Sequence, residues 1–334
     1  MNRPDYLVPL LYGQSIFHIF RSEYRLALSL AERIEKIGDV TMQLQGRRLM
    51  GSIRCYLGEF VAARDLLEQC CGLVDPAHRQ GAYDPYPQML IMLAVTLAHL
   101  GYIDQARSWM NEALLEARQQ PQTLAIVLTA ATWIEAITRS PELHRRAEEL
   151  LALSTEHGFP QHLGWATIYL GMSFTLRQQA QEGLALLMQG LEAVRATGNI
   201  ANTPHLFMAL AEAHLMLGQP VQGLNWIAEA AHTIEATEER VEKAEMHRLQ
   251  GDLLYATGDR VSAERSYDEA LAVARRQSAK LFQLRAGISL AGLWRDQGKR
   301  TEARGLLAPL YSWFTEGFDT PVLQDAKALL DELA

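Results

Sequence analysis

Residues 245–276, EMHRLQGDLLYATGDRVSAERSYDEALAVARR, decide the fold. Apolar residues recur at helical spacing on both sides of Gly258-Asp259. A glycine at this point can take the positive φ that closes a helix at its C-terminus. The stretch therefore predicts a helix, a tight turn and a second helix. The apolar positions are Met246, Leu249, Leu253 and Leu254 before the turn, and Ala263, Tyr267, Ala270 and Leu271 after it.

Small residues recur at near-regular intervals along the whole chain, in two columns that include Gly251 and Ala263 of this unit. A first column, at intervals of 36 to 43 residues, comprises Ser15, Gly51, Ala94, Glu135, Gly171, Ala211, Gly251 and Ala291. A second column, twelve residues later each time, comprises Ala27, Ala63, Ala106, Ala147, Gly183, Gly223, Ala263 and Ala303. Glu135 is the only large residue in the two columns. Small residues at these positions let the two helices of a hairpin approach closely. The turn glycine also recurs, at Gly58, Gly101, Gly218, Gly258 and Gly298.

These columns predict an all-α, right-handed α-solenoid of about eight helix-turn-helix repeats with a C-terminal capping helix. We expect one superhelical domain over residues 1–334. The expected repeats span residues 5–40, 41–75, 86–120, 122–157, 161–198, 202–237, 241–276 and 281–316, and the capping helix spans 321–333. Thr320 is the expected cap of that last helix. Tyr311, Trp313, Phe314 and Phe318 are expected to seal the last hairpin.

The chain resembles the tetratricopeptide repeat (TPR) family. The resemblance lies in Gly251, Gly258, Ala263, Tyr267 and Ala270, with Leu57-Gly58-Glu59-Phe60 and Leu100-Gly101-Tyr102 in earlier units. The period of about 40 residues departs from the usual 34 of that family, which implies taller units. Repeat arrays of this kind present long surfaces, so the resemblance implies recognition and not catalysis.

The resemblance narrows to the C-terminal sensor region of bacterial signal-transduction ATPases, which includes MalT-like regulators and the ATPase proteins linked to class III adenylate cyclases. The segments that carry it are Glu156-His157-Gly158-Phe159-Pro160, Leu293-Trp294-Arg295-Asp296-Gln297-Gly298-Lys299-Arg300 and Trp313-Phe314-Thr315-Glu316-Gly317-Phe318-Asp319-Thr320. This resemblance implies a regulatory module in signal transduction, and its expected partners include upstream ATPase or cyclase domains of the same polypeptide.

Composition excludes several classes of function. A net charge of −8 disfavours nucleic-acid binding, which needs a basic face. The apolar runs fall short of the length that spans a bilayer, and no signal-peptide pattern begins the chain, so we expect a cytoplasmic protein without membrane contact. No phosphate-binding loop occurs, and no histidine pair has the spacing of a metal site. We expect no enzyme activity, no metal and no cofactor. The pair Glu238-Glu239 is interpreted as a solvated helix face.

Partner binding is predicted on the concave wall, which the first helix of each unit lines. The predicted contact residues are Trp165, Ile168, Met172, His205, Met208, Glu212, Arg248, Asp252, Tyr255, Arg285 and Arg295. Apolar and charged groups together suit a protein or peptide segment. The alternative is a small-molecule effector of the MalT-like kind, on which Trp165 would stack while Arg248 or Glu212 fixed polar groups. A continuous open groove would favour the first, and enlarged pockets with buried charge the second.

Two further surfaces are candidates. The long connection between Gly72 and Pro87 is rich in proline and glycine, and its residues His78, Arg79, Tyr83 and Asp84 could close over one end of the groove. At the N-terminus, residues 6–12 (YLVPLLY) begin a repeat with no capping helix before it. An apolar edge is therefore expected there, either from a cut within a longer protein or as a surface for self-association.

Overall fold

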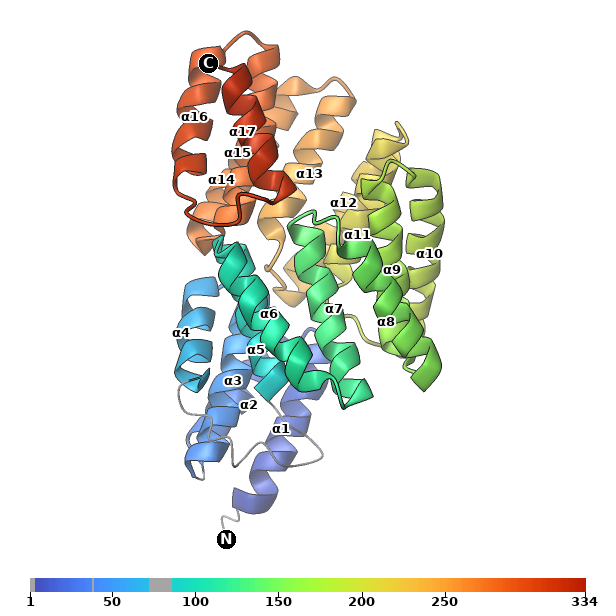
Figure 1. Cartoon of the computed structure of the whole chain (residues 1–334), viewed down its shortest axis with the longest axis vertical. Helices are drawn as coiled ribbons and strands as arrows, with labels where there is room; N and C mark the ends of the chain where they lie inside the picture. The colour runs from blue at the N-terminus through green and yellow to red at the C-terminus, as the bar shows by residue number, and fades with distance from the viewer. Residues whose placement is uncertain (1–3, 38, 72–85) are drawn as a thin grey trace.

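The computed structural model describes residues 4–37, 39–71 and 86–334 of the chain (Figure 1). This part contains seventeen α-helices and no strand, which confirms the predicted all-α repeat solenoid. The helices are α1 (Pro4–Phe20), α2 (Tyr24–Glu35), α3 (Val40–Tyr56), α4 (Phe60–Cys71), α5 (Tyr86–Leu100), α6 (Ile103–Ala117), α7 (Pro121–Ile137), α8 (Leu143–His157), α9 (Pro160–Leu176), α10 (Ala180–Thr197), α11 (Thr203–Met216), α12 (Pro220–Thr237), α13 (Lys243–Ala256), α14 (Arg260–Gln277), α15 (Lys280–Asp296), α16 (Arg300–Ser312) and α17 (Pro321–Glu332).

The odd-numbered helices form an inner layer and the even-numbered helices an outer one. Each odd helix from α3 to α15 packs on the next odd helix as well as on its own hairpin partner, and α5 also contacts α15. The inner helix α5 is buried almost all round, whereas the outer helix α14 buries only one stripe. The N-terminal helices lie at one end of the longest axis and the C-terminal helices at the other, and α7 to α12 lie to one side (Figure 1). The two ends of the array meet where α5 contacts α15.

The turn inside each hairpin holds one residue in the left-handed region. The five predicted turn glycines all have positive φ, between 68° and 93°. The other three hairpins place Ser22, Arg139 and Gln178 there, with φ of 54°, 56° and 65°. Side chains other than glycine disfavour this conformation, so these three turns carry some backbone strain.

The fourth unit corrects the first small column. In the other seven units the turn residue follows the column residue by seven positions, as Gly258 follows Gly251. Counting seven positions back from Arg139, the turn residue of the fourth unit, reaches Thr132 and not Glu135. Thr132 is fully buried, whereas Glu135 is half-buried. The assignment of Glu135 was wrong because the α7–α8 turn spans residues 138–142, two more than the α13–α14 turn at 257–259, so Thr132 lies fifteen and not twelve residues before Ala147.

Contacts between residues about two hundred positions apart close the superhelix upon itself. The backbone N–H groups of Arg240 and Val241 donate to the Tyr56 carbonyl at 2.8 and 3.0 Å. Farther along, the Arg107 guanidinium donates to the Asp319 carboxylate at 2.8 Å. The Trp313 ring also packs on Tyr102 of the first half, with 5.6 Å between ring centroids. Trp313 thus joins two turns of the superhelix, and the sealing of the last hairpin by the tail aromatics stays a prediction.

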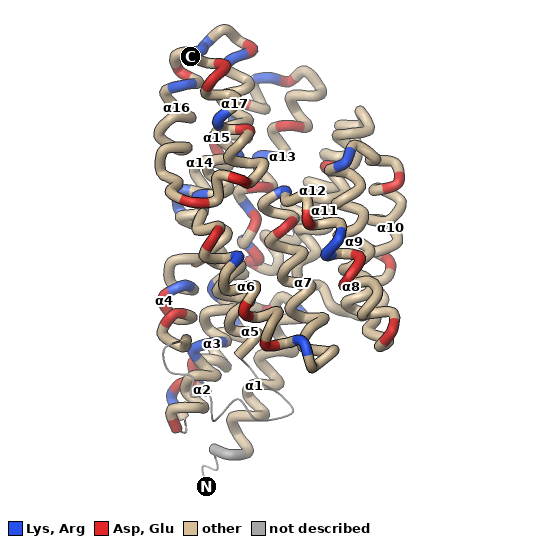
Figure 2. Tube along the Cα trace, viewed as in Figure 1, with Lys and Arg blue, Asp and Glu red and all other residues tan. Residues whose placement is uncertain are grey.

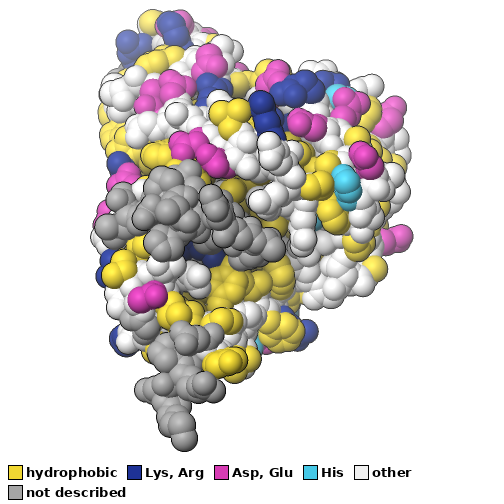
Figure 3. Space-filling view, turned by 60° about the horizontal axis from the view of Figure 1, so that its bottom comes forward, with side chains coloured by type: hydrophobic (Ala, Val, Ile, Leu, Met, Phe, Trp, Pro, Cys, Tyr) yellow, Lys and Arg dark blue, Asp and Glu magenta, His cyan; other side chains and the backbone are white. Residues whose placement is uncertain are grey.

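The two ends of the array differ. Helix α17 buries Val322, Leu323, Ala326 and Leu329, and Thr320 occupies its predicted N-cap position. The Thr320 hydroxyl, however, donates to the Gly317 carbonyl at 2.6 Å and makes no capping hydrogen bond. Hydrophobic side chains gather towards the N-terminal end (Figure 3). The expected loop residues His78, Arg79, Tyr83 and Asp84 lie outside the described residues. In the described ranges, none of the helices combines the length and the apolar character needed to cross a bilayer.

Candidate functional site: a charged axial cavity

A small cavity of about 40 Å³ lies in the interior, between the inner helices α7, α9, α11, α13 and α15. Its wall combines aliphatic side chains with ionisable ones, which is unusual for a protein interior. The apolar part comprises Ala136, Ile137, Met172, Leu176, Met208, Ala209, Leu249 and Phe282. The ionisable part comprises Arg139, His205, Glu212, Glu242, Glu245 and Arg285. The volume suits a few water-sized groups.

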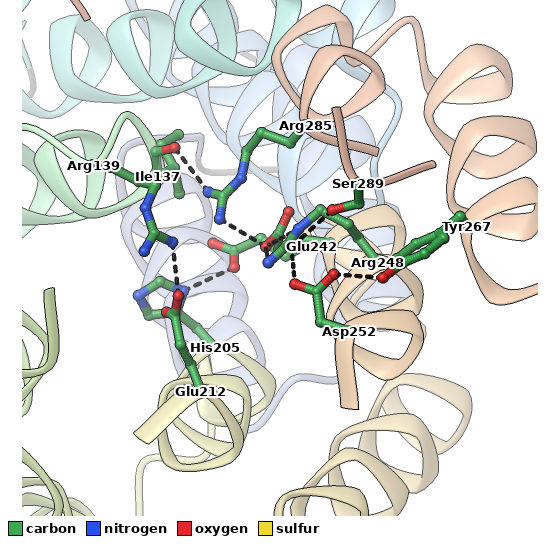
Figure 4. A network of polar contacts seen from close by, with 11 residues as sticks. Ile137, Arg139, His205, Glu212, Glu242, Arg248, Asp252, Tyr267, Arg285 and Ser289 are labelled. Carbon is green, nitrogen blue, oxygen red and sulfur yellow. Dashed lines mark hydrogen bonds and ion pairs between the residues drawn. The ribbon is translucent and has the colours of Figure 1, made fainter. Parts of the chain in front are cut away.

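Two arginines converge on a single carboxylate oxygen. Arg248 and Arg285 pair with Oε1 of Glu245 at 2.6 and 2.9 Å. Arg285 also donates to the Ile137 carbonyl at 3.1 Å, so it joins α15 to the end of α7. Burial lowers the pKa of Arg285 to about 10, which still leaves it charged at neutral pH. On the far side, Arg248 pairs with Asp252, which accepts from the Tyr267 hydroxyl at 2.8 Å (Figure 4).

The long α7–α8 turn brings a third arginine to the cavity. Arg139 pairs with Glu212 of α11 at 2.7 Å (Figure 4). Burial alone would raise the pKa of Glu212, but the guanidinium of Arg139, with Arg285 and Arg248 nearby, outweighs it and lowers the pKa to about 2. The Glu212 carboxylate is therefore ionised at any physiological pH.

A histidine and a tryptophan share the second buried glutamate. Nδ1 of His205 lies 2.8 Å from Oε2 of Glu242, and the Trp133 indole N–H donates to Oε1 at 2.6 Å. Burial raises the pKa of Glu242, but His205 opposes it and the net shift is downward. In the neutral tautomer that donates from Nδ1 to this carboxylate, Nε2 is an acceptor.

Two buried polar atoms at the cavity have no hydrogen-bond partner in the described part of the chain. They are Nε2 of His205 and Oε2 of Glu245, on residues that are only 6% and 8% exposed. Leaving a buried polar atom unpaired costs free energy, about 1 to 3 kcal/mol for each. Oε2 of Glu245 is an acceptor, and Nε2 of His205 is one in the neutral tautomer described above, so in that state the cavity is suited to a group that donates hydrogen bonds.

A wider cleft of about 380 Å³ adjoins the cavity on the outside. Arg139 and Leu176 line both spaces and form the wall between them. The rest of the cleft belongs to the α7–α8 turn, to the facing parts of α8 and α9, and to Pro321 at the start of α17. Its other lining residues are Ser140, Pro141, Leu143, His144, Ser173 and Arg177.

The structure distributes the sequence-predicted contact residues over three places. Met172, His205, Met208, Glu212 and Arg285 line the cavity, and Arg248 and Asp252 extend its charged network. Trp165 and Ile168 are buried elsewhere in the core, at 3% and 0% exposure. Tyr255 and Arg295 lie nearer the C-terminal end, where each contacts Asp296. The expected open concave wall is thus largely closed, because the turns of the superhelix pack against one another.

Sequence reasoning missed Arg139, Glu242 and Glu245, and it misinterpreted Glu239. Glu239 is 2% exposed and not solvated, because it faces the turn between α1 and α2. Its carboxylate accepts from the Tyr24 hydroxyl at 2.7 Å and from the Asn202 N–H at 3.0 Å. Burial raises the pKa of Glu239 to about 7. The spacing of Glu239, Glu242 and Glu245 by three residues is the signal that could have revealed a shared inner face.

In the described ranges there is also no cluster of His, Cys, Asp and Glu arranged to hold a metal ion. Basic and acidic residues alternate along the trace of the chain (Figure 2).

Comparison with known proteins supports the fold. A family model described as tetratricopeptide repeat matches residues 87–112, in α5 and α6. A search of curated protein sequences found no match. Among solved structures, the chain is similar to a Rap protein complexed with competence and sporulation factor, with 12% identity over 98% of this chain and 97% of that one and a TM-score of 0.59.

Two further solved structures are similar to the chain. The apo form of RapI has 11% identity over 87% of this chain and 99% of that one, with a TM-score of 0.51. A signal-transduction ATPase with a tetratricopeptide repeat sensor, from Pyrococcus horikoshii, has 15% identity over 98% of this chain and 49% of that one, with a TM-score of 0.48. At these identities the similarity concerns the helical-repeat fold.

Proposed function

We propose that the chain is a non-catalytic, cytoplasmic regulatory module that senses a small ligand through the axial cavity. The observation that carries this proposal is the pair of unpartnered buried acceptors, Nε2 of His205 and Oε2 of Glu245, in the cavity wall. A ligand that donated hydrogen bonds to them would remove the cost of leaving them unpaired. The buried ionisable groups of the cavity wall favour this alternative over the peptide segment in an open groove that was also expected.

The cavity is placed to control the shape of the array. Its wall includes residues from five inner helices, and two interactions across it, Trp133 with Glu242 and Arg285 with the Ile137 carbonyl, join units more than one hundred residues apart. A ligand that binds the closed form better than a loosened one shifts the population towards the closed form. The outer surface, which a protein or peptide partner would contact, would change with it.

Ligand-dependent stability tests the proposal. We expect at least one compound in a library of metabolites and short peptides to raise the thermal unfolding midpoint of the full chain, because ligands that bind only the folded state stabilise it. Ala209→Leu, which fills the cavity, should abolish the response, whereas Ala256→Leu, at an exposed position of α13, should keep it. Equal responses in both variants, or no response to any compound, would refute the assignment.

A second candidate function is self-association through α1, which one specific surface favours. Tyr6, Leu10, Phe17 and Phe20 are 70%, 58%, 58% and 44% exposed and fall on one helical face. Such an apolar stripe suits packing against a helix of a second copy. The double variant Leu10→Glu, Phe17→Glu should then remain monomeric in analytical ultracentrifugation at concentrations where the unmodified chain dimerises. A monomeric unmodified chain at all concentrations would eliminate this candidate.

The segments that resemble sensor regions of signalling ATPases support one extension of the proposal. The module would transmit the ligand signal to an ATPase or nucleotide cyclase, in the same polypeptide or as a partner. Adding the purified array to such an enzyme should change its turnover only when the cavity ligand is present. A change in turnover that did not require the ligand would show that the array acts on the enzyme independently of the cavity.

A further inference from the structure

We propose that the ligand is a small zwitterion, whose ammonium group enters the axial cavity and whose carboxylate lies in the adjoining cleft. This inference rests on the proposed function and specifies the chemistry of the ligand. It depends on three observations: the acceptors left unpaired in the cavity, the balance of charge in its wall, and the basic character of the cleft outside it.

The cavity favours an ammonium group. The unpaired atoms, Nε2 of His205 and Oε2 of Glu245, can both accept hydrogen bonds, and an ammonium group has three donors. The wall holds the carboxylates of Glu212, Glu242 and Glu245 but only the guanidinium groups of Arg139 and Arg285, which leaves one negative charge when His205 is neutral. Arg248 and Asp252 behind this wall add one charge of each sign and leave the balance unchanged. With His205 neutral, a single positive charge therefore completes the site.

The size of the cavity limits what can enter. A volume of about 40 Å³ accommodates an ammonium group with the carbon that bears it, but not a ring or a long side chain. The remainder of a ligand must extend outwards. Arg139 and Leu176 separate the cavity from the cleft, so a displacement of these two side chains would connect the spaces.

The cleft favours an anion. Arg139, Arg177 and His144 line it, together with the hydroxyl-bearing Ser140 and Ser173, and no acidic residue belongs to its lining. Pro321 is the first residue of α17, so the positive end of that helix dipole also faces the cleft. A volume of about 380 Å³ is in the range of small-molecule sites. A carboxylate held here could pair with Arg177, and with Arg139 on the wall of the cavity.

Matched probes test the two ends of the ligand separately. Isothermal titration of the full chain would use alanine, Ala-Ala and Ala-Ala-Ala, which also distinguish a free amino acid from a short peptide. N-acetyl-Ala-Ala lacks the ammonium charge, and Ala-Ala amide lacks the carboxylate charge. Putrescine carries only positive charges, and succinate carries only negative ones. We expect a free zwitterion to bind and either block to weaken binding about tenfold or more, as the loss of a charge-assisted hydrogen bond does. Equal affinity for blocked and free forms would overturn the proposal, as would no binding of any zwitterion at about 10 mM.

Variants assign each end to its residues. Glu245→Gln should remove the discrimination between free and acetylated dipeptide. If this buried change unfolds the chain, Arg177→Ala remains informative, because Arg177 is exposed and outside the cavity wall. It should remove the discrimination between the free and amidated C-terminus, whereas Arg195→Ala, an exposed arginine on α10, should retain it. Retained discrimination in Arg177→Ala would contradict the assignment of the carboxylate to the cleft.

The outcomes separate this inference from the proposed function. Stabilisation by a neutral or purely anionic library compound that Ala209→Leu abolishes would keep the cavity as the sensor and remove the zwitterion. Zwitterion binding that Ala209→Leu leaves unchanged would place the ligand elsewhere and remove both. Without stabilisation by any compound, the proposed function itself fails.

Discussion

The α13–α14 unit and the α7–α8 unit meet at the axial cavity, but they bring charge to it in different ways. The first follows the repeat closely, and its charged side chains Glu245 and Arg248 lie on an inner helix. The second departs from the repeat, and its charged group Arg139 lies in a turn that is two residues longer than its counterpart. In the regular unit, the same inner helix packs in the array and carries the charged residues of the site. In the irregular unit, the charged residue comes from the turn, where the sequence departs from the repeat.

The largest expected effect comes from breaking the regular unit. In Gly251→Val, the new Cβ would lie 2.4 Å from Cε1 of Tyr267, whose hydroxyl is held by Asp252. Overpacking of this kind should reduce the free energy of unfolding by about 3 kcal/mol in urea titrations. Gly292→Ala in α15 is the matched control, because a Cβ there meets no atom within 4 Å. A similar loss in both variants would show that helix crowding is not the reason for the small column.

The turn that precedes the regular unit should make stability depend on pH. Burial raises the pKa of Glu239 to about 7, so the folded state retains the proton while the unfolded chain, with a pKa near 4.5, loses it. Stability should therefore fall as the pH rises from about 4.5 to about 7, by about 2 kcal/mol or more. Glu239→Gln should lack this fall in urea unfolding at pH values across that window.

Glu238→Gln is the neighbouring control for this measurement. Glu238 pairs with Arg25 at the surface, at 2.7 Å, and such exposed pairs contribute under about 1 kcal/mol. This variant should retain the pH dependence of the unmodified chain. If Glu239→Gln retained it too, the titrating group between the two superhelical turns would have to be another one.

A smaller effect is expected from the irregular unit. Arg139→Gly relieves the left-handed backbone at φ 56° but removes the partner of Glu212, so the net loss should be about 1 kcal/mol at neutral pH. Because the pKa of Glu212 is lowered to about 2, the pair stabilises the fold above the unfolded pKa of 4.5, and this contribution disappears as the pH falls towards 2. The variant should lack that part of the acid dependence in unfolding measured between these values.

Gln178→Gly separates the two contributions. Gln178 occupies the same turn position with φ 65°, and relief of strain alone should stabilise that variant by roughly 0.5 to 1 kcal/mol. Stabilisation of Arg139→Gly by the same amount would mean that its ion pair with Glu212 contributes nothing.

The same contrast explains how much could be predicted from the sequence. The columns through Gly251 and Ala263 follow from backbone approach, so they reveal the fold, and helical counting from them reaches Met208, Glu212 and Arg285. Arg139 lies beyond a change of register that counting cannot detect. Trp165 was predicted to line an accessible wall but is buried. The closure of the superhelix depends on contacts such as Tyr56 with Arg240, which no local pattern encodes.

The smallest expected effect tests that register directly. If Thr132 is the column residue of the irregular unit, then Glu135 lies beside the helix crossing, half-buried, and Glu135→Ala should change the free energy of unfolding by under about 0.5 kcal/mol. Thr132→Leu should cost about 2 kcal/mol, because Thr132 is fully buried and a larger side chain would push the helices apart. If urea unfolding showed a larger loss of stability for Glu135→Ala than for Thr132→Leu, Glu135 would be the column residue after all. The two additional residues of the α7–α8 turn would then need another explanation, and the longer interval of this unit would no longer account for the position of Arg139 at the cavity.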